Sequence, residues 1–464
     1  MRPRGHTPNL RFLLLLTVLA LLTRLVWVLW IHPPGDYVFS DMGQYVERAR
    51  RLVLNGFEPG SRELAWQVWG THVLLALPLH LFGLDNLTAA AVMWGLMGAA
   101  AVPLAYLLAC RLCRYAGTAY AVGVILLLWH PNLSNTGYFL SETPFLLFQL
   151  AATYGLVVVW QDGRGAWPTG IACAIAFAVR PQIAIFFVAV LLLWILHRRR
   201  LPHVGVRQLV GVSLPILLML LFSLWRFHAH TGYWGGIAEN ANMNSTAGRC
   251  HNIVTQAFKT QAQLRHSERR DNTRDGRRVG LPQYRRLAQV LPENHPFALR
   301  PALGSETIRF VGYIGDPEVH RQIRQRCVAA TGWVEQVRYS VVNASLLWFF
   351  GRQWPELERG HRVFLRYVEV YKYIFVWVFW LPSLVGVGWA VAGLRRRPEW
   401  TMLGIQILVS IGVAAAFFGT IRLRTPYDPY SILLAAEVAT LAGVAILNYV
   451  RRRARAPEAD APTA

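Results

Sequence analysis

The chain has 464 residues, of which 54% are hydrophobic, and its mean hydropathy is +0.31. The apolar residues occur in blocks close to the roughly 20 residues that a membrane-spanning helix needs, which excludes an ordinary soluble globular protein. The formal net charge is +22. No base-stacking motif or zinc-ligand spacing accompanies the basic residues, so nucleic-acid binding does not explain the charge.

Apolar segments of spanning character recur along the whole chain. The clearest are 12–31, 87–110, 138–160, 182–196, 209–227, 373–394, 401–420 and 431–449. Two shorter segments, 118–131 and 168–179, become long enough when flanking residues join them. The pattern predicts an all-α polytopic membrane protein with about ten transmembrane helices.

The first apolar segment, 12–31, is too long for the core of a signal peptide, and no small-residue cleavage site follows it. We interpret it as an uncleaved first span. Arg24 lies within this segment, and a charged residue inside a span usually faces the protein interior. The sequence assigns Arg24 no role.

The segment 68–84 is apolar but short, and it contains Pro78 and two histidines. We interpret it as a helix along the outer membrane surface, because the basic clusters between spans then all lie in the cytoplasm. Those clusters are Arg111 with Arg114, Arg164, Arg198–Arg200 with Arg207, Arg395–Arg397 and Arg451–Arg455. Both termini are then cytoplasmic, and we expect a bacterial inner (plasma) membrane protein.

Three regions follow from this topology. Residues 1–227 form an N-terminal transmembrane module whose first external loop is 32–86, residues 228–367 form a large external loop region, and residues 368–464 form C-terminal spans and a cytoplasmic tail. Within the large loop, Asp316-Pro317 predicts a helix start. Apolar residues then recur at spacings of three and four, which predicts an amphipathic helix that packs over the membrane-facing opening of the protein. These residues are Val319, Ile323, Cys327, Ala330, Val334, Val337 and Val341.

Of the five cysteines, only Cys250 and Cys327 lie in the large loop. An external compartment oxidises thiols, so these two residues are candidates for a disulfide, although spacing alone cannot show that they are close.

The first external loop carries the most informative acidic residue. Asp41 lies just outside the first span and is followed by Tyr45 and a basic helical segment. A carboxylate there sits where a membrane-embedded donor and a water-borne acceptor could meet. The alternative is that Asp41 only caps a helix over 42–54, since acidic residues are common at helix N-termini.

Four segments, in the same order along the chain, resemble motifs of the GT-C superfamily of membrane glycosyltransferases. The likeness is greatest to the branch of protein O-mannosyltransferases and the lipid A aminoarabinose transferase. The segments are the loop around Asp41, the turn 130–143 ending in Ser141-Glu142-Thr143, the small-residue helix 170–181 closing on Arg180-Pro181, and Arg422-Leu-Arg424-Thr-Pro426-Tyr-Asp-Pro429. The likeness extends over most of the chain except roughly 240–310.

The resemblance implies a sugar donor linked to a polyprenyl phosphate. It assigns to Asp41 the role of general base, which takes the proton of an attacking hydroxyl. Arg422 and Arg424, with Arg180 next, would bind the donor phosphate, because a guanidinium binds phosphate with two parallel hydrogen bonds. The alternative for these arginines is contact with lipid headgroups at the membrane surface.

Further substrate contacts are expected from residues near these motifs. Tyr45 follows Asp41, and Glu142 either positions the donor sugar or caps the helix that begins there. The polar segment 239–252 contains Asn242, Asn244 and His251. These could bind sugar hydroxyls, and an irregular polar loop is the alternative.

A metal requirement stays open. Many relatives carry an Asp-Glu pair in the first loop, whereas here Met42 follows Asp41, which puts any Mg²⁺ or Mn²⁺ site built on such a pair in doubt.

The sequence therefore predicts an inverting glycosyltransferase that uses a lipid-phosphate donor on the non-cytoplasmic face. Its expected partners are the bilayer, the polyprenyl-phosphate sugar and an acceptor glycan, lipid or protein, without nucleic acid. The alternatives are a lipid or sugar transporter, which would place ionisable residues at the bilayer midplane, and a non-catalytic scaffold. Neither the sugar nor the acceptor follows from the sequence.

Overall fold

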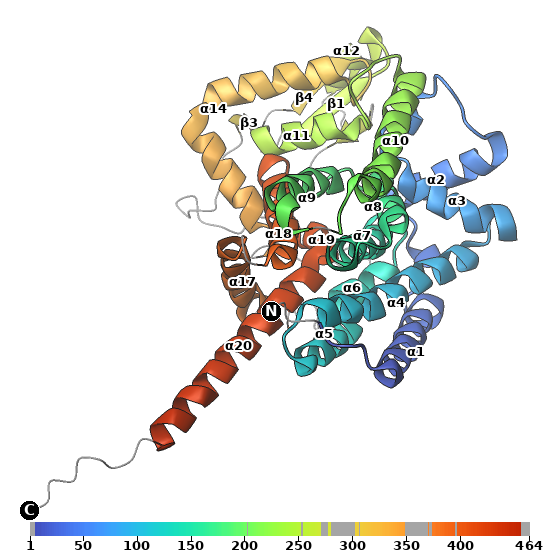
Figure 1. Ribbon diagram of the computed structural model, residues 1–464. Helices are drawn as coiled ribbons and strands as arrows, with labels where there is room; N and C mark the ends of the chain where they lie inside the picture. The colour runs from blue at the N-terminus through green and yellow to red at the C-terminus, as the bar shows by residue number, and fades with distance from the viewer. Residues whose placement is uncertain are drawn as a thin grey trace, which may run out of the picture.

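The computed structural model describes residues 5–201, 203–251, 254–270, 277–279, 302–305, 307–348, 370, 374–394 and 397–455. Within the external region predicted over 228–367, residues 252, 253, 271–276, 280–301, 306 and 349–367 lie outside this description. The tail from residue 456, which the sequence predicts to be cytoplasmic, and residues 1–4 also lie outside it. The described chain is a helical bundle that carries a small sheet at one end (Figure 1).

Each of the ten predicted spans coincides with a helix. They are α1 Leu10–Val26 continued by the π-helix η1 Trp27–Ile31, α4 Leu87–Leu112, α5 Ala116–Leu128, α7 Glu142–Asp162, α8 Ala166–Val179, α9 Ile183–His197, α10 Val206–Thr231, the π-helix η5 Phe375–Trp380 continued by α17 Leu381–Ala392, α18 Pro398–Ala416, and α20 Asp428–Arg455. Seven of the described helical segments are long and apolar enough to cross a membrane, and α5, α8 and α9 are shorter apolar helices. The chain is an integral membrane protein.

Arg24 is almost completely buried, at 1% exposed, although it lies in the middle of the first span. Its guanidinium donates to the carbonyls of Leu127 at 2.7 Å and Leu126 at 3.0 Å. These are among the last carbonyls of α5, which have no partner within their own helix. Arg24 therefore caps the C-terminus of α5 and connects it to α1 by hydrogen bonds. This role is structural.

The first external loop folds into short helices against the bundle. They are the 3₁₀ helix η2 Pro34–Tyr37, α2 Ser40–Asn55, the 3₁₀ helix η3 Arg62–Ala65 and α3 Gly70–Phe82. Met42, Tyr45, Val46 and Ala49 line the buried side of α2 at helical spacing. With 13 residues, α3 is about 20 Å long, the same length as α5. It belongs with α5, α8 and α9 to the shorter apolar helices.

The region predicted to be external, residues 228–367, contains helices of its own and a small sheet. The sequence did not predict the sheet. The helices are α11 Asn240–Cys250, α12 Gln261–Arg270 and α14 Pro317–Ser345, and the strands are β1 Val254–Phe258, β2 Arg277–Val279, β3 Ala302–Ser305 and β4 Thr307–Val311. In the sheet, β1 pairs antiparallel with β2, where Thr255 faces Val279, and parallel with β4, where Thr255 faces Ile308. Asp316 caps α14 by accepting from the backbone N–H groups of Glu318 and Val319, which confirms the predicted helix start.

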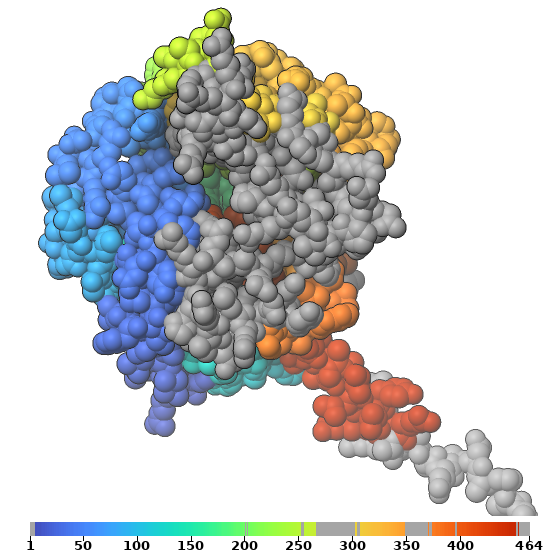
Figure 2. Space-filling model, turned by 180° about the vertical axis from the view of Figure 1, so that it is seen from behind, coloured from blue at the N-terminus to red at the C-terminus, as the bar shows by residue number. Residues whose placement is uncertain are grey.

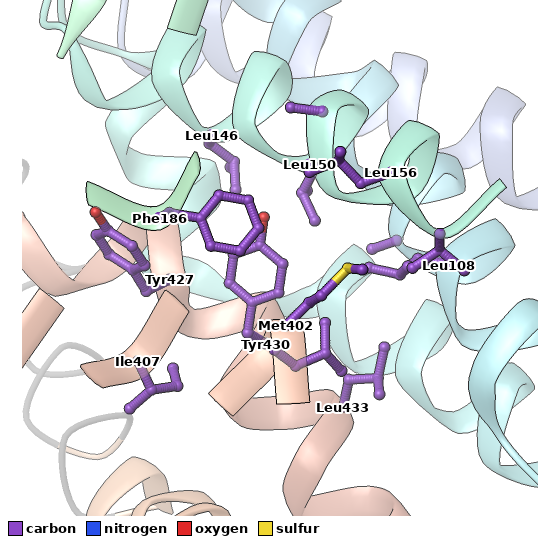
Figure 3. Packing of buried hydrophobic residues seen from close by; sticks show 14 of the residues in the cluster. Leu108, Leu146, Leu150, Leu156, Phe186, Met402, Ile407, Tyr427, Tyr430 and Leu433 are labelled. Carbon is purple, nitrogen blue, oxygen red and sulfur yellow. The ribbon is translucent and has the colours of Figure 1, made fainter. Parts of the chain in front are cut away.

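The main core lies between helices from both ends of the chain. Leu146 and Leu150 of α7 and Phe186 of α9 pack with Met402 of α18 and Tyr430 of α20 (Figure 3). Beyond this core, the distal part of α20 projects from the body as a separate rod (Figure 2). The shared core holds the C-terminal helices against the N-terminal helices, and α7 also carries Glu142 at its first position.

Candidate functional site

The candidate site is formed where four helical elements begin or end. Asp41 lies in the first turn of α2, and Glu142 is the first residue of α7. Arg180 follows the last residue of α8 in an extended conformation. Arg422 lies in the short helix α19 Ile421–Arg424, which Thr420 caps by accepting from the backbone N–H of Leu423. Helix ends leave side chains free to point along the axis, so residues from distant parts of the chain meet here.

Arg422 links two carboxylates. Its Nη1 and Nη2 each lie 3.4 Å from Oδ2 of Asp41, and its Nε lies 2.5 Å from Oε1 of Glu142. Arg180 also donates to Oε1 of Glu142, and its Nε donates to the hydroxyl of Ser141 at 3.0 Å. The four charged groups therefore form one continuous chain in the order Asp41, Arg422, Glu142 and Arg180.

The network runs from a partly exposed end to a buried one. The side chain of Asp41 is 35% exposed and that of Arg422 is 17% exposed, whereas that of Glu142 is fully buried. Two cations and two anions balance each other, which lowers the cost of burying them. Asp41 is thus the member of the network that a molecule from outside reaches first.

Tyr45 lies one helical turn after Asp41 and is buried. Burial raises the pKa of its phenol, and the nearby carboxylates of Asp41 and Glu142 raise that pKa further. A raised pKa keeps the hydroxyl protonated, so Tyr45 stays a neutral hydrogen-bond donor beside the network.

Arg424 lies apart from this network. Its Nε donates to Oδ1 of Asp428 at 2.8 Å, its Nη1 donates to the carbonyl of Leu347 at 3.2 Å, and its guanidinium lies 3.6 Å from the ring centroid of Phe375. Trp129 donates to the other oxygen of Asp428 at 2.8 Å. Arg424 is only 3% exposed. Arg424 therefore connects α19 with Asp428 of α20, with Leu347 and with Phe375 of η5. Its guanidinium is not directed toward Asp41 or Glu142.

The polar segment 239–252 is helical from Asn240 to Cys250, so the interpretation as an irregular loop was wrong. The carbonyl of Asn242 accepts from Arg324 at 3.2 Å, and Asn244 is half-buried. His251 is buried with its ring edge-on to Tyr339 at 4.1 Å. Burial, with a smaller effect of the Arg249 charge, lowers the pKa of His251 to about 3. Asn242 and His251 therefore contact residues of α14.

A disulfide joins Cys250 at the end of α11 to Cys327 in α14, with their Cα atoms 5.3 Å apart. These are the two cysteines that the sequence placed in the external region. Cys110, Cys113 and Cys173 are free and buried.

Among the described residues, no three His, Cys, Asp or Glu side chains are grouped so that they could hold a metal ion. Asp41 and Glu142 both face Arg422, whose positive charge would repel a cation between them. The arrangement of these residues does not fit a metal bound by the two carboxylates, and no step proposed below passes through one.

Sequence reasoning missed the residues that hold the Arg422 segment in place. Asn343 of α14 donates to the carbonyls of Gly248 at 3.2 Å and Phe417 at 3.3 Å. A Cβ on Gly248 would clash with the carbonyl of Phe417, and a Cβ on Gly419 would clash with that of Asn343. In the sequence, Gly419 close to Arg422 is the feature that could have indicated this backbone contact. No feature of the sequence points to Asn343.

A model of the dolichyl-phosphate-mannose-protein mannosyltransferase family matches residues 78–229. None of the curated proteins matches the chain significantly. Among solved structures, the chain is similar to ArnT from Cupriavidus metallidurans bound to undecaprenyl phosphate, with 14% identity and a TM-score of 0.37 over 93% of this chain and 78% of that one. The apo form of ArnT gives the same identity and TM-score over 92% and 76%. The family match agrees with the resemblance to GT-C membrane glycosyltransferases of the protein O-mannosyltransferase branch.

Proposed function

We propose that the protein is a membrane glycosyltransferase that transfers a sugar, with inversion, from a polyprenyl-phosphate donor to an acceptor hydroxyl on the non-cytoplasmic side. The contact of Arg422 with Asp41 at 3.4 Å carries this proposal. It places a carboxylate suited to proton abstraction beside a guanidinium suited to a leaving phosphate.

In the proposed step, the acceptor oxygen attacks the anomeric carbon and its proton passes to Asp41. A new carbon–oxygen bond forms, and the bond between the anomeric carbon and the phosphate oxygen breaks. The electron pair of that bond stays with the polyprenyl phosphate. The phosphate is thus displaced in a single step by an oxygen that attacks from the opposite face of the sugar, which inverts the configuration of the anomeric carbon.

In this step negative charge passes from Asp41 to the leaving phosphate, and Arg422 is placed to contact both groups. Asp41 loses its negative charge when it takes the proton, while the leaving phosphate gains one. Because Arg422 contacts Asp41, neutralising Asp41 makes the guanidinium available to the phosphate. A fixed cation positioned where charge develops is typically worth a few kcal/mol.

Glu142 would serve as the resident counter-ion of the site. It binds both Arg180 and Arg422 through the same oxygen, Oε1. Without it, Arg180 and Arg422 would lose the carboxylate that they share, at a large electrostatic cost. With it, the arginines stay oriented but hold an incoming phosphate less tightly, which favours release of the polyprenyl phosphate product.

The proposed side of the membrane rests on the disulfide and on the basic clusters. Disulfides persist in oxidising compartments, and the Cys250–Cys327 bond lies in the helices that contact the Arg422 segment. Basic clusters between other spans favour the cytoplasmic side. We therefore place both termini in the cytoplasm and the site on the opposite face of a bacterial inner membrane.

The test uses lipid-linked sugars extracted from cells that lack the protein, incubated with membranes that contain it. Asp41→Asn should lower sugar transfer by about 10²–10⁴-fold, because the amide cannot take a proton. Asp36→Asn is the matched control, since Asp36 is exposed in the same loop. Unchanged transfer by Asp41→Asn would contradict the proposal, and movement of intact lipid-linked sugar across the membrane without transfer would favour a transporter.

A further inference from the structure

The exposed surface of α14 changes character along its length. In its first half up to residue 326 the exposed side chains are mostly polar, namely Glu318, Arg321, Gln322, Gln325 and Arg326, and the large exposed apolar residues begin at Val328, which is 42% exposed. In its second half the large exposed residues are apolar, from 52% to 76% exposed, namely Trp333, Val334, Val337 and Val341. Gly332 separates the halves with φ 73° and ψ 174°, a conformation that glycine adopts far more readily than other residues. Each half can therefore face a different environment.

The opposite side of the second half is already occupied by protein. Gln336 donates to the carbonyl of Arg249 at 2.9 Å, Tyr339 packs against His251, and Asn343 bonds to Gly248 and Phe417. These contacts fix the rotation of the helix about its axis. Its valines cannot turn inward without breaking them.

The second half ends beside two spans. Phe417, the partner of Asn343, is the residue that directly follows α18. Trp348, shortly after the end of α14, packs against Trp380 of η5 with ring centroids 5.8 Å apart. The span formed by η5 and α17 has its own exposed apolar residues, Trp377 and Leu381. The helix bends down toward α17 and α18 in Figure 1, and α14 forms an outer edge of the molecule in Figure 2.

We propose that residues 333–345 of α14 lie in the interfacial layer of the membrane, with Trp333, Val334, Val337 and Val341 in contact with lipid. The bilayer is the occupant that this surface fits, because it adjoins the lipid-facing side of a span. A tryptophan at the boundary matches the preference of that side chain for the membrane interface. Glu335 and Arg338 flank the apolar face as an ion pair at 3.4 Å, and the long arginine side chain can extend toward the headgroups.

This placement sets the depth of the candidate site. Gly332 would mark the membrane surface, and Asn343 connects the inserted half to the segment just before Arg422. Arg422 would then lie at the depth of lipid phosphate groups. The membrane contact itself does not depend on the proposed glycosyltransferase activity.

The test labels single engineered cysteines with an environment-sensitive fluorophore in the full-length protein reconstituted in phosphatidylcholine vesicles. Val337→Cys reports on the second half, and Gln325→Cys is the control on the first half of the same helix. The native thiols Cys110, Cys113 and Cys173 are buried, and Cys250 and Cys327 are paired, so background labelling is low. Quenching is measured with iodide in the water and with lipids spin-labelled near the headgroup.

The label on Val337→Cys should be quenched several-fold more strongly by spin-labelled lipid than the label on Gln325→Cys, and the order should reverse with iodide. Equal iodide quenching at the two positions would overturn the proposal. Protection of Val337→Cys from both quenchers would also overturn it, because the surface would then be covered by protein.

Discussion

Asp41 and Arg422 are 381 positions apart in the chain, yet Oδ2 of Asp41 lies 3.4 Å from Nη1 of Arg422. Arg422 is held from the other side by Glu142, and Glu142 is held by Arg180. A change to any one of these groups therefore alters the charge that its neighbours experience. The effects of changes at these positions should be strongly non-additive.

Arg422 and Arg424 should respond differently to the same substitution. Arg422→Ala should lower turnover by about 10²–10³-fold, because it removes a cation from the leaving phosphate. Arg424→Ala should instead destabilise the fold by roughly 3–5 kcal/mol, because it leaves the fully buried Asp428 without its cation. Sugar transfer and thermal unfolding of both purified variants check this. Normal stability with lost transfer in Arg424→Ala would place Arg424 back in the donor site.

Glu142→Gln should strengthen product binding. The amide keeps the shape of the side chain but removes its charge, so Arg180 and Arg422 become available to the dianionic phosphate of the product. We expect polyprenyl phosphate to inhibit on the order of tenfold more strongly, or about 1.4 kcal/mol, with a lower kcat. Ser141→Ala is the control, since it removes a neutral partner of Arg180. Weaker inhibition of Glu142→Gln than of the wild type would contradict the counter-ion role.

Asn343 should act as a positioning residue for Arg422. Asn343→Ala removes the donor to the buried carbonyl of Gly248 and the half-buried carbonyl of Phe417, at about 1–3 kcal/mol, and frees the segment that carries Arg422. Gln336→Ala is the matched control, because Gln336 is a buried amide of the same helix that bonds α11 but not Phe417. At equal loss of stability, only Asn343→Ala should lower kcat for the folded fraction. Equal kcat in the two variants would reduce Asn343 to a purely structural role.

Stability should fall as the pH drops below the ordinary histidine pKa of about 6.5. His251 has a pKa of about 3 in the folded protein, so between these values the unfolded chain binds a proton that the folded chain does not. The free energy of unfolding then decreases with falling pH by up to about 1.4 kcal/mol per unit for this residue. His251→Asn, which tolerates the positive φ at this position, should flatten that slope. An unchanged slope, measured by denaturant unfolding across this pH range, would contradict neutral burial of His251.

Local hydrophobicity by itself located the membrane-spanning helices of this protein. A stretch of apolar residues must satisfy its backbone internally in a bilayer, so length and composition suffice to locate each span. The local sequence also determined the start of α14. Asp316 accepts from the first backbone N–H groups of the helix, and Pro317 occupies its first position. The same local patterns pointed to Asp41 as an acidic residue at the outer edge of the first span.

Only the tertiary structure decided which charges meet. Arg422 and Arg424 are two positions apart, and side chains at that spacing on a helix point in different directions. One guanidinium therefore faces Asp41 and Glu142 while the other enters the core beside Asp428. The role of Asn343 depends on two glycines, Gly248 and Gly419, that let separate backbones approach. Such contacts arise from packing between distant segments, which no local pattern of residues encodes.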